Sequence, residues 1–141
     1  IKHIEKHDYE GGSKYIGEVM NGKRNGKGKY SSNNEVYEGD FVDGKYDGFG
    51  SIVYKSGNKY VGQYKKDAIE GKGTFMFSTG EVYEGDFVNG AMEGYGKYSF
   101  PSGQYYEGEW KNDKKNGQGV LVLSNGQEMR GLFVDGEFKG K

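Results

Sequence analysis

The 141-residue sequence contains no cysteine, a single proline and two histidines. The absence of cysteine excludes a disulfide framework and thiolate metal sites, and it is compatible with an intracellular protein. The longest aliphatic run, residues 120–123, is far shorter than the roughly 20 residues of a membrane-spanning helix, and no N-terminal apolar stretch has the character of a signal peptide. The net charge of −1 gives no global attraction for nucleic acid or for an anionic membrane.

Apolar residues are also scarce, at 33% of the chain, which is too little for a thick central core. Aromatic residues nevertheless make up 16% of the sequence, whereas disordered segments are poor in aromatics. We therefore expect an ordered chain that spreads its apolar side chains over a thin structure.

Glycine and tyrosine recur at a fixed period. Five tyrosines, which we place at position 1 of a repeat, are separated by 22, 23, 23 and 23 residues: Tyr15, Tyr37, Tyr60, Tyr83 and Tyr106. In the same register, positions 3, 8, 12, 14 and 21 hold 26 of the 27 glycines, and only Gly11 falls outside. Such a period indicates a repeat architecture, in which each unit packs on its neighbours.

The other aromatic residues keep this register. Positions 1, 5, 16 and 18 hold 17 of the 22 aromatics. Positions 1, 3 and 5 alternate ring, glycine and ring, and this period of two is typical of a β-strand. Positions 2 and 4, on the other side of the strand, are often acidic. We therefore expect the rings to lie together on one face of a sheet.

The repeat predicts one β-hairpin per unit. Asn-Gly and Asp-Gly pairs, such as Asn21-Gly22 and Asp43-Gly44, suit tight turns with positive φ. Ser-Gly, Thr-Gly and Asn-Gly pairs mark the turn at the other end of each hairpin. The predicted fold is all-β, an elongated array of stacked antiparallel hairpins in a single-layer twisted sheet. Glycines at positions 3 and 14 would leave room for rings to lie flat on the neighbouring strand.

The register also predicts the organisation of the chain. A half repeat with an N-terminal lead-in covers residues 1–14. Five repeats follow, at residues 15–36, 37–59, 60–82, 83–105 and 106–128, and a C-terminal half repeat covers residues 129–141. Because both ends fall inside a repeat, we expect the chain to be a piece of a longer protein.

Two stretches carry a family resemblance. Residues 106–112, Tyr-Glu-Gly-Glu-Trp-Lys-Asn, resemble the opening of a MORN (membrane occupation and recognition nexus) repeat, and residues 22–30 resemble its second half. The resemblance recurs in register over residues 9–141. The sequence departs from the pattern in three ways. Asp67 and Asp113 replace glycine at position 8, and Met129 replaces the position-1 tyrosine. The first repeat is also one residue short.

The resemblance implies an elongated hairpin array that serves as a scaffold, often at cytoskeletal structures or membrane junctions. In some members the array is joined to a separate catalytic domain. Lipid binding is attached to the family name. The location implied is the cytoplasm, in association with the cytoskeleton or a membrane.

The residues do not assemble an evident catalytic site. Carboxylates are plentiful but recur at repeated positions, whereas an active site needs a unique constellation. His3 and His7, with Asp8 beside them, lie in a stretch that we expect to be irregular, and terminal histidines are rarely a metal site. Residues 71–74, Gly-Lys-Gly-Thr, lack the residue order and the following helix of a phosphate-binding loop. We expect no enzyme activity, cofactor or metal.

Two binding functions remain. The first is capture of an extended or helical peptide on the aromatic face. The candidates for such a protein-binding site are the five aromatics outside the regular ring positions, whose alternative role is packing at loops: Tyr46, Phe49, Tyr95, Tyr105 and Phe138.

The second is binding of an anionic phospholipid such as a phosphoinositide, through a basic cluster at Lys23, Arg24, Lys27 and Lys29. Acidic residues nearby favour a solvated edge instead. Nucleic-acid binding is not expected, because no surface is net basic. Unpaired end strands also allow homodimerisation, and the last hairpin near Phe133 and Phe138 is the expected place.

Overall fold

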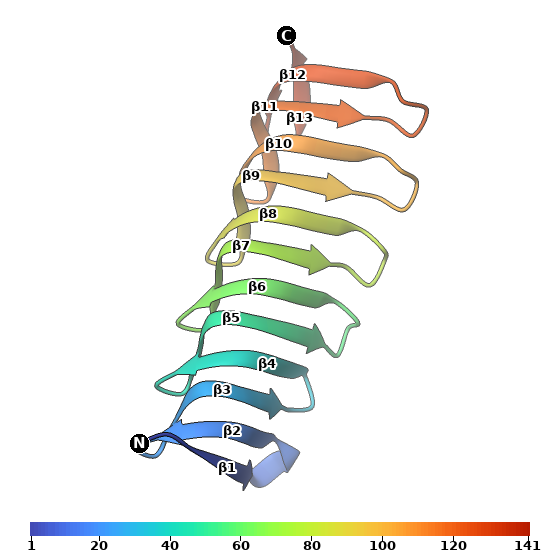
Figure 1. The fold of residues 1–141 in the computed structure, drawn as a ribbon. Helices are drawn as coiled ribbons and strands as arrows, with labels where there is room; N and C mark the ends of the chain where they lie inside the picture. Colours follow the sequence, from blue (N-terminus) through green and yellow to red (C-terminus); the bar gives the residue numbers. More distant parts are fainter. The chain divides into compact units, whose positions relative to one another are not determined.

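The computed structural model describes all 141 residues, and almost all of them belong to β-strands and the turns that join them (Figure 1). The chain forms two compact units, residues 1–69 and residues 70–141. Within each unit the strands are antiparallel and are hydrogen-bonded in chain order. The predicted all-β array of antiparallel hairpins is confirmed.

The first unit contains six strands and one short 3-10 turn, η1 (Glu10–Gly12). Its first strand lies in the stretch that was expected to be irregular, and that expectation is wrong: residues 3–8 pair with the next strand without a break in register. The strands are β1 (His3–Asp8), β2 (Lys14–Met20), β3 (Lys23–Ser31), β4 (Glu35–Val42), β5 (Lys45–Tyr54) and β6 (Lys59–Lys65).

The next strand along the chain, β7 (Ala68–Met76), begins at the end of the first unit's sequence and continues into the second. The second unit contains six further strands: β8 (Val82–Val88), β9 (Ala91–Ser99), β10 (Tyr105–Lys111), β11 (Lys114–Val122), β12 (Glu128–Val134) and β13 (Glu137–Gly140). The chain has no helix with the length and apolar character that crossing a bilayer requires.

The tight turn of each hairpin places two successive residues in the left-handed region. At the first turn, φ is +52° at Asn21 and +75° at Gly22. Two positive φ values define a type I′ turn, whose twist matches that of the strands it joins. The Asn-Gly and Asp-Gly pairs therefore have the conformation that the sequence predicts.

Two turns have this conformation without glycine. Asp67 and Asp113, which occupy position 8, have φ values of +72° and +68°. The Oδ1 atom of Asp67 accepts a hydrogen bond from the Tyr46 N–H at 2.9 Å, and that of Asp113 accepts one from the Met92 N–H at 2.8 Å. Each aspartate thereby binds the backbone of the preceding repeat, an interaction that offsets the strain of a left-handed non-glycine residue.

The hairpins β2–β3, β4–β5, β8–β9 and β10–β11 each contain a β-bulge. In the second repeat the strand register shifts between Gly39 and Phe41, and Gly48 on the facing strand has a φ of +109°. A left-handed residue at this point favours glycine, which accounts for the glycine at position 12. The period-two pattern alone predicts unbroken strands, so the bulge is a difference from the expected hairpin.

The position-1 tyrosines form the core of the fold. All five are at most 1% exposed. In the second repeat, the Tyr37 hydroxyl donates a hydrogen bond at 2.7 Å to the carbonyl oxygen of Asp40, the residue at the bulge. The other four tyrosines make the same bond to position 4, which shows why tyrosine rather than phenylalanine stands there: Tyr15 to Glu18, Tyr60 to Gln63, Tyr83 to Asp86 and Tyr106 to Glu109.

Glycines at positions 3 and 14 make room for these rings. A Cβ atom on Gly50 would lie on ring atoms of Tyr37, and a Cβ on Gly39 would lie 2.5 Å from the Cα of Gly50. Since real Cβ atoms do not approach other atoms so closely, neither position can hold a side chain without displacing the ring or the strand. The expectation that these glycines let the rings lie flat is confirmed.

The rings make edge-to-face contacts from one repeat to the next. In the first unit, Tyr37 contacts Phe41 of its own repeat and Tyr64 of the following one, with centroids 5.1 and 5.4 Å apart. In the second unit, Tyr106 contacts Trp110 and Phe133 in the same way, at 5.2 and 4.9 Å. This geometry is the preferred one for aromatic pairs, and it joins neighbouring hairpins as the nearest-neighbour packing of a repeat protein requires.

Gly50→Ala is expected to destabilise the first unit by about 1–3 kcal/mol, because the added methyl group overpacks the site against the Tyr37 ring. Urea unfolding followed by circular dichroism measures this change. Ser51→Ala, one residue along on the opposite face, is the matched control and should change the midpoint little. Equal midpoints for the two variants would contradict the packing role of Gly50.

The buried tyrosines should also make the fold sensitive to alkali. Burial raises the pKa of Tyr60 and of Tyr106 to about 12, and it raises the pKa of Tyr37 and Tyr83 as well. The unfolded chain releases its phenolic protons near pH 10, while the folded chain retains them until about pH 12. The free energy of unfolding should therefore be constant below about pH 9. It should then fall as the pH rises from about 10 to 12, by up to about 1.4 kcal/mol per pH unit for each tyrosine.

Absorbance at about 295 nm as a function of pH, together with unfolding curves at each pH, tests this expectation. Titration of all thirteen tyrosines near pH 10 in the folded protein would contradict it.

Candidate functional site on the ring face

The side chains at positions 1, 5, 10, 16 and 18 point to one side of the sheet, and we call this side the ring face. The register places position 1 opposite position 16, as in the pair Tyr37 and Ile52, and position 5 opposite position 10, as in Phe41 and Tyr46. The other side, the opposite face, carries positions 2, 4, 13 and 15. Position 10 was not assigned to the rings from the sequence, because the bulge shifts the alternation.

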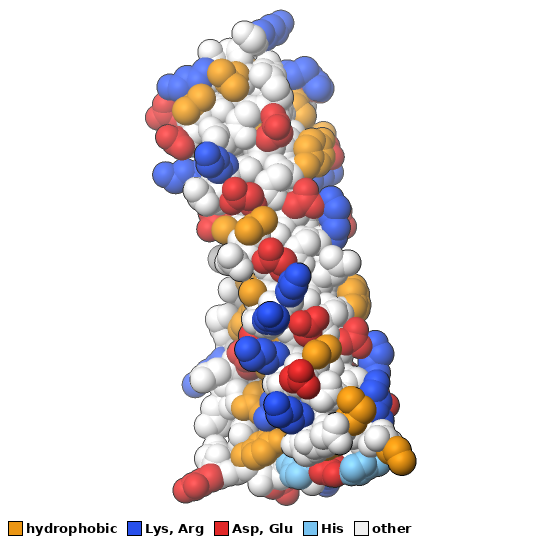
Figure 2. All heavy atoms as spheres, turned by 90° about the vertical axis from the view of Figure 1, so that its left-hand side faces the viewer, with side chains coloured by type: hydrophobic (Ala, Val, Ile, Leu, Met, Phe, Trp, Pro, Cys, Tyr) orange, Lys and Arg blue, Asp and Glu red, His pale blue; other side chains and the backbone are white.

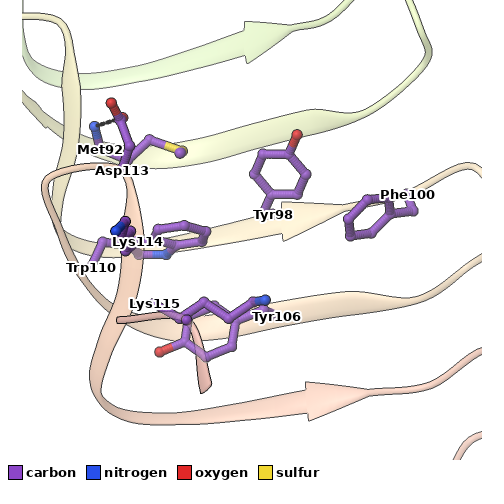
Figure 3. A pocket seen from close by; sticks show the side chains of 9 residues that line it. Met92, Tyr98, Phe100, Tyr106, Trp110, Asp113, Lys114 and Lys115 are labelled. Carbon is purple, nitrogen blue, oxygen red and sulfur yellow. Dashed lines mark hydrogen bonds between the residues drawn. The ribbon is translucent and has the colours of Figure 1, made fainter. Parts of the chain in front are cut away.

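The ring face of the second unit contains a hollow of about 300 Å³ (Figure 3). Its lining is mostly apolar: Met92, Tyr98, Phe100, Tyr106 and Trp110. The hollow is an open one; β9 and β10 supply four of these side chains, and Phe100 follows directly after β9. Such a surface suits an apolar side chain better than a small polar molecule, because few polar groups converge on it.

Charged residues lie at the tight-turn edge of this hollow. They are Asp113, Lys114 and Lys115. Figure 3 shows the hydrogen bond between the Met92 backbone nitrogen and the Asp113 carboxylate, 2.8 Å long. The Nζ of Lys115 lies 5.9 Å from the centroid of the Tyr106 ring. The edge of the hollow is therefore a tight turn that a hydrogen bond holds in place, and it carries the two ammonium groups of Lys114 and Lys115.

The first unit has a more polar hollow of about 390 Å³ at the corresponding turn of the first repeat. Tyr9, Lys23 and Arg24 are among the residues that line it, together with His7 and Asp43.

Aromatic rings surround the Arg24 guanidinium in this hollow. Its Cζ atom lies 4.7 Å from the centroid of Tyr30, 5.3 Å from those of Tyr9 and Tyr15, and 5.9 Å from that of Phe41. These distances are within the range of cation–π attraction. Arg24 is thus held on the ring face by rings rather than by a carboxylate.

The acidic residues at position 4 bind the bulge. The Asp40 carboxylate accepts a hydrogen bond from the Phe49 N–H at 2.9 Å and also pairs with the Lys27 ammonium. Partial burial would raise the pKa of Asp40, but these two partners outweigh it and hold the pKa below its ordinary value. Other position-4 acids accept the equivalent N–H bond: Glu18 from Lys27, Asp86 from Tyr95 and Glu109 from Gln118.

Position 11 joins each tight turn to the next. In the first unit, Asn25 Oδ1 accepts a hydrogen bond at 3.0 Å from the N–H of Asp43, which begins the following turn. The other position-11 side chains accept the same bond from a backbone N–H: Asp47 from Lys66, Glu70 from Asn89, Glu93 from Asn112 and Asn116 from Asp135. The sequence contained a signal for this contact, because position 11 is Asn, Asp or Glu in all five repeats.

The two histidines share one carboxylate instead of facing Asp8. Because alternate residues of β1 point the same way, His3, Glu5 and His7 lie together, and both Nε2 atoms contact the Glu5 carboxylate, with that of His7 at 2.6 Å. The hydrogen bond from His7, followed by that from His3, lowers the pKa of Glu5. No group of three or more metal-ligating side chains in the structure has the geometry to hold a metal ion.

The five aromatics proposed for protein binding do not come together. Tyr46 and Phe138, both at position 10, lie on the ring face. The Tyr46 ring stacks on Tyr37 with centroids 3.7 Å apart, and its hydroxyl donates to Glu35. Phe138 packs on Phe133 at 5.2 Å.

The other three lie on the opposite face. Phe49 and Tyr95 are 56% and 54% exposed, and Tyr105 lies under the Lys97 ammonium at 4.3 Å. None of the five lines either hollow described above. The aromatic residues that do line the hollow of the second unit occupy the regular ring positions 1, 5, 16 and 18.

The basic cluster proposed for lipid is divided between the two faces. Lys27 and Lys29 have exposed side chains on the opposite face, where Lys27 pairs with Asp40. Arg24 points to the ring face, and Lys23 lines the hollow beside it at the tight turn. Figure 2 shows one side of the molecule, on which basic and acidic side chains are interspersed within each unit. The four residues therefore do not act as one basic patch.

Trp110→Ala is expected to destabilise the second unit by about 3–5 kcal/mol. The indole is 6% exposed, contacts Tyr83 and Tyr106 edge-on, and donates a hydrogen bond from Nε1 to the Gly96 carbonyl oxygen at 3.0 Å. Hydrogen exchange of the β9–β11 amides measures the local loss of stability.

Tyr95→Ala, which removes an exposed ring from the same strand pair, is the control and should leave exchange nearly unchanged. Unaltered protection in Trp110→Ala would contradict the buried position of the indole.

The repeat of this chain matches a repeat that is known from other proteins. The sequence profile of the MORN repeat matches residues 15–35, 37–59, 60–82, 83–105 and 106–128. MORN repeat-containing protein 3 of Xenopus laevis is 38% identical over 75 residues, which cover 48% of this chain and 32% of that protein. The chain therefore matches about a third of the length of this relative.

Among solved structures, the TCP domain of SAS-4 from Drosophila melanogaster, determined in complex with a proline-rich motif of Ana2, covers 92% of this chain. The match extends over 90% of that domain, with 12% identity and a TM-score of 0.41. These values are too low for a shared fold to be inferred. The five repeat matches, in contrast, cover well over half of the sequence, and the chain belongs to the MORN repeat family.

Proposed function

We propose that the chain is a non-catalytic scaffold whose ring face binds a protein partner. The observation that carries this proposal is the open, mostly apolar hollow around Trp110 in the second unit. Tryptophan, tyrosine and methionine are enriched where proteins bind one another, and anchor side chains of a partner are usually seated in such hollows.

The recurrent acids support the non-catalytic part of the proposal. A general acid or base needs a carboxylate that is available to a substrate. The acids at positions 4 and 11 are instead bonded to backbone N–H groups of the bulges and turns, as Asp40 is to Phe49 and Glu93 is to Asn112. Their roles are therefore structural in each repeat where the bond is made.

The shape and lining of the hollow support an extended or helical peptide segment as the occupant. The hollow is open and lies on the ring face of a sheet, where a segment could cross several strands and place successive side chains on the rings. Family membership supports a scaffolding role at cytoskeletal structures or membrane junctions, and we propose a cytoplasmic location on that ground.

A second candidate function is binding of an anionic phospholipid through the opposite face of the first unit. Ile16, which is 49% exposed, lines a shallow, mostly apolar surface together with Lys27 and Lys29. An exposed apolar side chain beside basic ones is a feature of membrane-binding surfaces. Lipid clusters usually contain 4–8 basic residues, however, and here Lys27 is paired with Asp40.

Site-specific photo-crosslinking tests which face is used. Benzoylphenylalanine replaces Met92, which lines the hollow, or Tyr95, which is exposed on the opposite face of the same strand. The proposal predicts a discrete crosslinked protein from position 92 and none from position 95. Crosslinking from position 95 alone would contradict it.

Liposome co-sedimentation at physiological salt tests the second candidate. Neutral vesicles are compared with vesicles that contain phosphatidylserine or a phosphoinositide. The scaffold proposal predicts no pelleting with either kind. Pelleting with the anionic vesicles only, abolished in the double variant Lys27→Glu/Lys29→Glu, would favour lipid binding.

A further inference from the structure

Basic residues occur together at positions 9 and 10 in only two of the five repeats. The first repeat has the pair Lys23–Arg24, and the fifth has the pair Lys114–Lys115. The three repeats between them have Lys45–Tyr46, Ala68–Ile69 and Ala91–Met92 at the same positions. Each of the two units therefore contains one basic pair at the tight-turn edge of its ring face.

Each pair lines a hollow, and its cations have no ion-pair partner in the structure. Lys114 and Lys115 lie beside the apolar floor of the hollow in the second unit, and Lys23 and Arg24 line the hollow in the first. None of these four side chains takes part in an ion pair of the structure, in contrast to Lys27 and Lys72, which pair with aspartates on the opposite face.

Only one carboxylate lines each of the two hollows. Asp113 is the one acidic residue that lines the hollow of the second unit, and its Oδ1 atom accepts the Met92 N–H. Asp43 is the one acidic residue that lines the hollow of the first unit. Each hollow thus has two full positive charges against one negative charge.

Packing on rings prepares the position-10 cations to receive an anion. Arg24 lies among four rings, and Lys115 lies over Tyr106. A cation that is partly removed from water beside apolar surface interacts more strongly with an incoming carboxylate than a fully hydrated one does. The guanidinium of Arg24 can also bind a carboxylate with two parallel hydrogen bonds.

We propose that the ring face selects an acidic segment of a partner protein. An apolar side chain of the segment rests on the floor formed by Met92, Tyr98 and Trp110, and its neighbouring Asp or Glu carboxylates bind Lys114 and Lys115. In the first unit, Lys23 and Arg24 receive carboxylates in the same way. This inference rests on the proposed protein-binding function and specifies the chemistry of the partner.

Peptide selection on the whole 141-residue chain identifies the chemistry that the ring face prefers. A displayed library of random twelve-residue peptides is selected on the immobilised chain, and a selected peptide is then synthesised. Trp110 is the only tryptophan of the chain and lines the hollow, so its fluorescence reports binding at that place. Selected peptides are expected to combine an apolar residue with flanking Asp or Glu.

The charge contribution is measured with matched variants. Replacement of the flanking Glu by Gln in the peptide, or Lys114→Glu/Lys115→Glu in the protein, should weaken binding by about tenfold or more, equivalent to about 1.4 kcal/mol. Lys55→Glu/Lys59→Glu, which changes the net charge equally in the other unit, should leave the affinity unchanged. The affinity for the Glu peptide should also fall as salt is raised.

The outcomes separate this inference from the function on which it rests. Selected peptides that shift Trp110 fluorescence but lack acidic residues, or whose affinity is unaffected by Lys114→Glu/Lys115→Glu, would overturn the acidic preference and leave protein binding intact. Failure to select any peptide that shifts the fluorescence would overturn both. A shift caused by phosphatidylserine vesicles and not by peptides would identify a membrane surface as the occupant and would contradict the proposal.

Discussion

The contact on which the fold depends is that between the tyrosine at position 1 and the glycine at position 14 of the same repeat. The ring of Tyr37 covers Gly50, and its hydroxyl binds the carbonyl oxygen of Asp40 at the bulge. The ring thereby fills the space above two strands and satisfies a backbone acceptor that the bulge removes from the ladder. Because the ring also touches the position-5 ring of the next hairpin, one side chain stabilises its own hairpin and its neighbour. A thin sheet with few apolar residues can be stable on this basis.

Much of this fold could be predicted from the sequence. The period of 23 residues, the alternation around Tyr37, Gly39 and Phe41, and the glycine-containing turns were sufficient for the hairpins and for the shared face of the rings. The bulge could not be predicted in this way, since alternation carries no information about an extra residue. For the same reason position 10 was not recognised as part of the ring face, although Tyr46 stacks on Tyr37 there. The hydrogen-bond acceptors at position 11 are visible in the sequence, because Asn, Asp or Glu occupies this position in all five repeats. Their role could not be predicted, since it depends on how close successive tight turns lie in the folded chain.

The candidate site was less predictable than the fold. Aromatics that break a repeat pattern are natural candidates for a binding function, yet Phe49 and Tyr95 lie on one face and Tyr46 on the other. Sequence proximity likewise suggested that four basic residues form one cluster. Residues of one strand can point to opposite sides of the sheet, however, and Arg24 lies on the ring face while Lys27 and Lys29 lie on the opposite face. The hollow of the second unit is lined by regular repeat residues such as Tyr98 and Trp110, which pack in the array while part of each ring stays accessible.

Position 10 differs from the other ring-face positions in how freely its residue varies. Positions 1, 3, 12 and 14 are restricted by ring packing and by left-handed backbone, whereas position 10 is Arg, Tyr, Ile, Met, Lys or Phe along the chain. Tandem duplication of 23 residues copies every contact that a hairpin needs, so an array can lengthen without a new solution to packing. Later single substitutions at position 10 can then give each copy its own chemical character. Selectivity can evolve along such an array one residue at a time, while the restricted positions preserve the architecture.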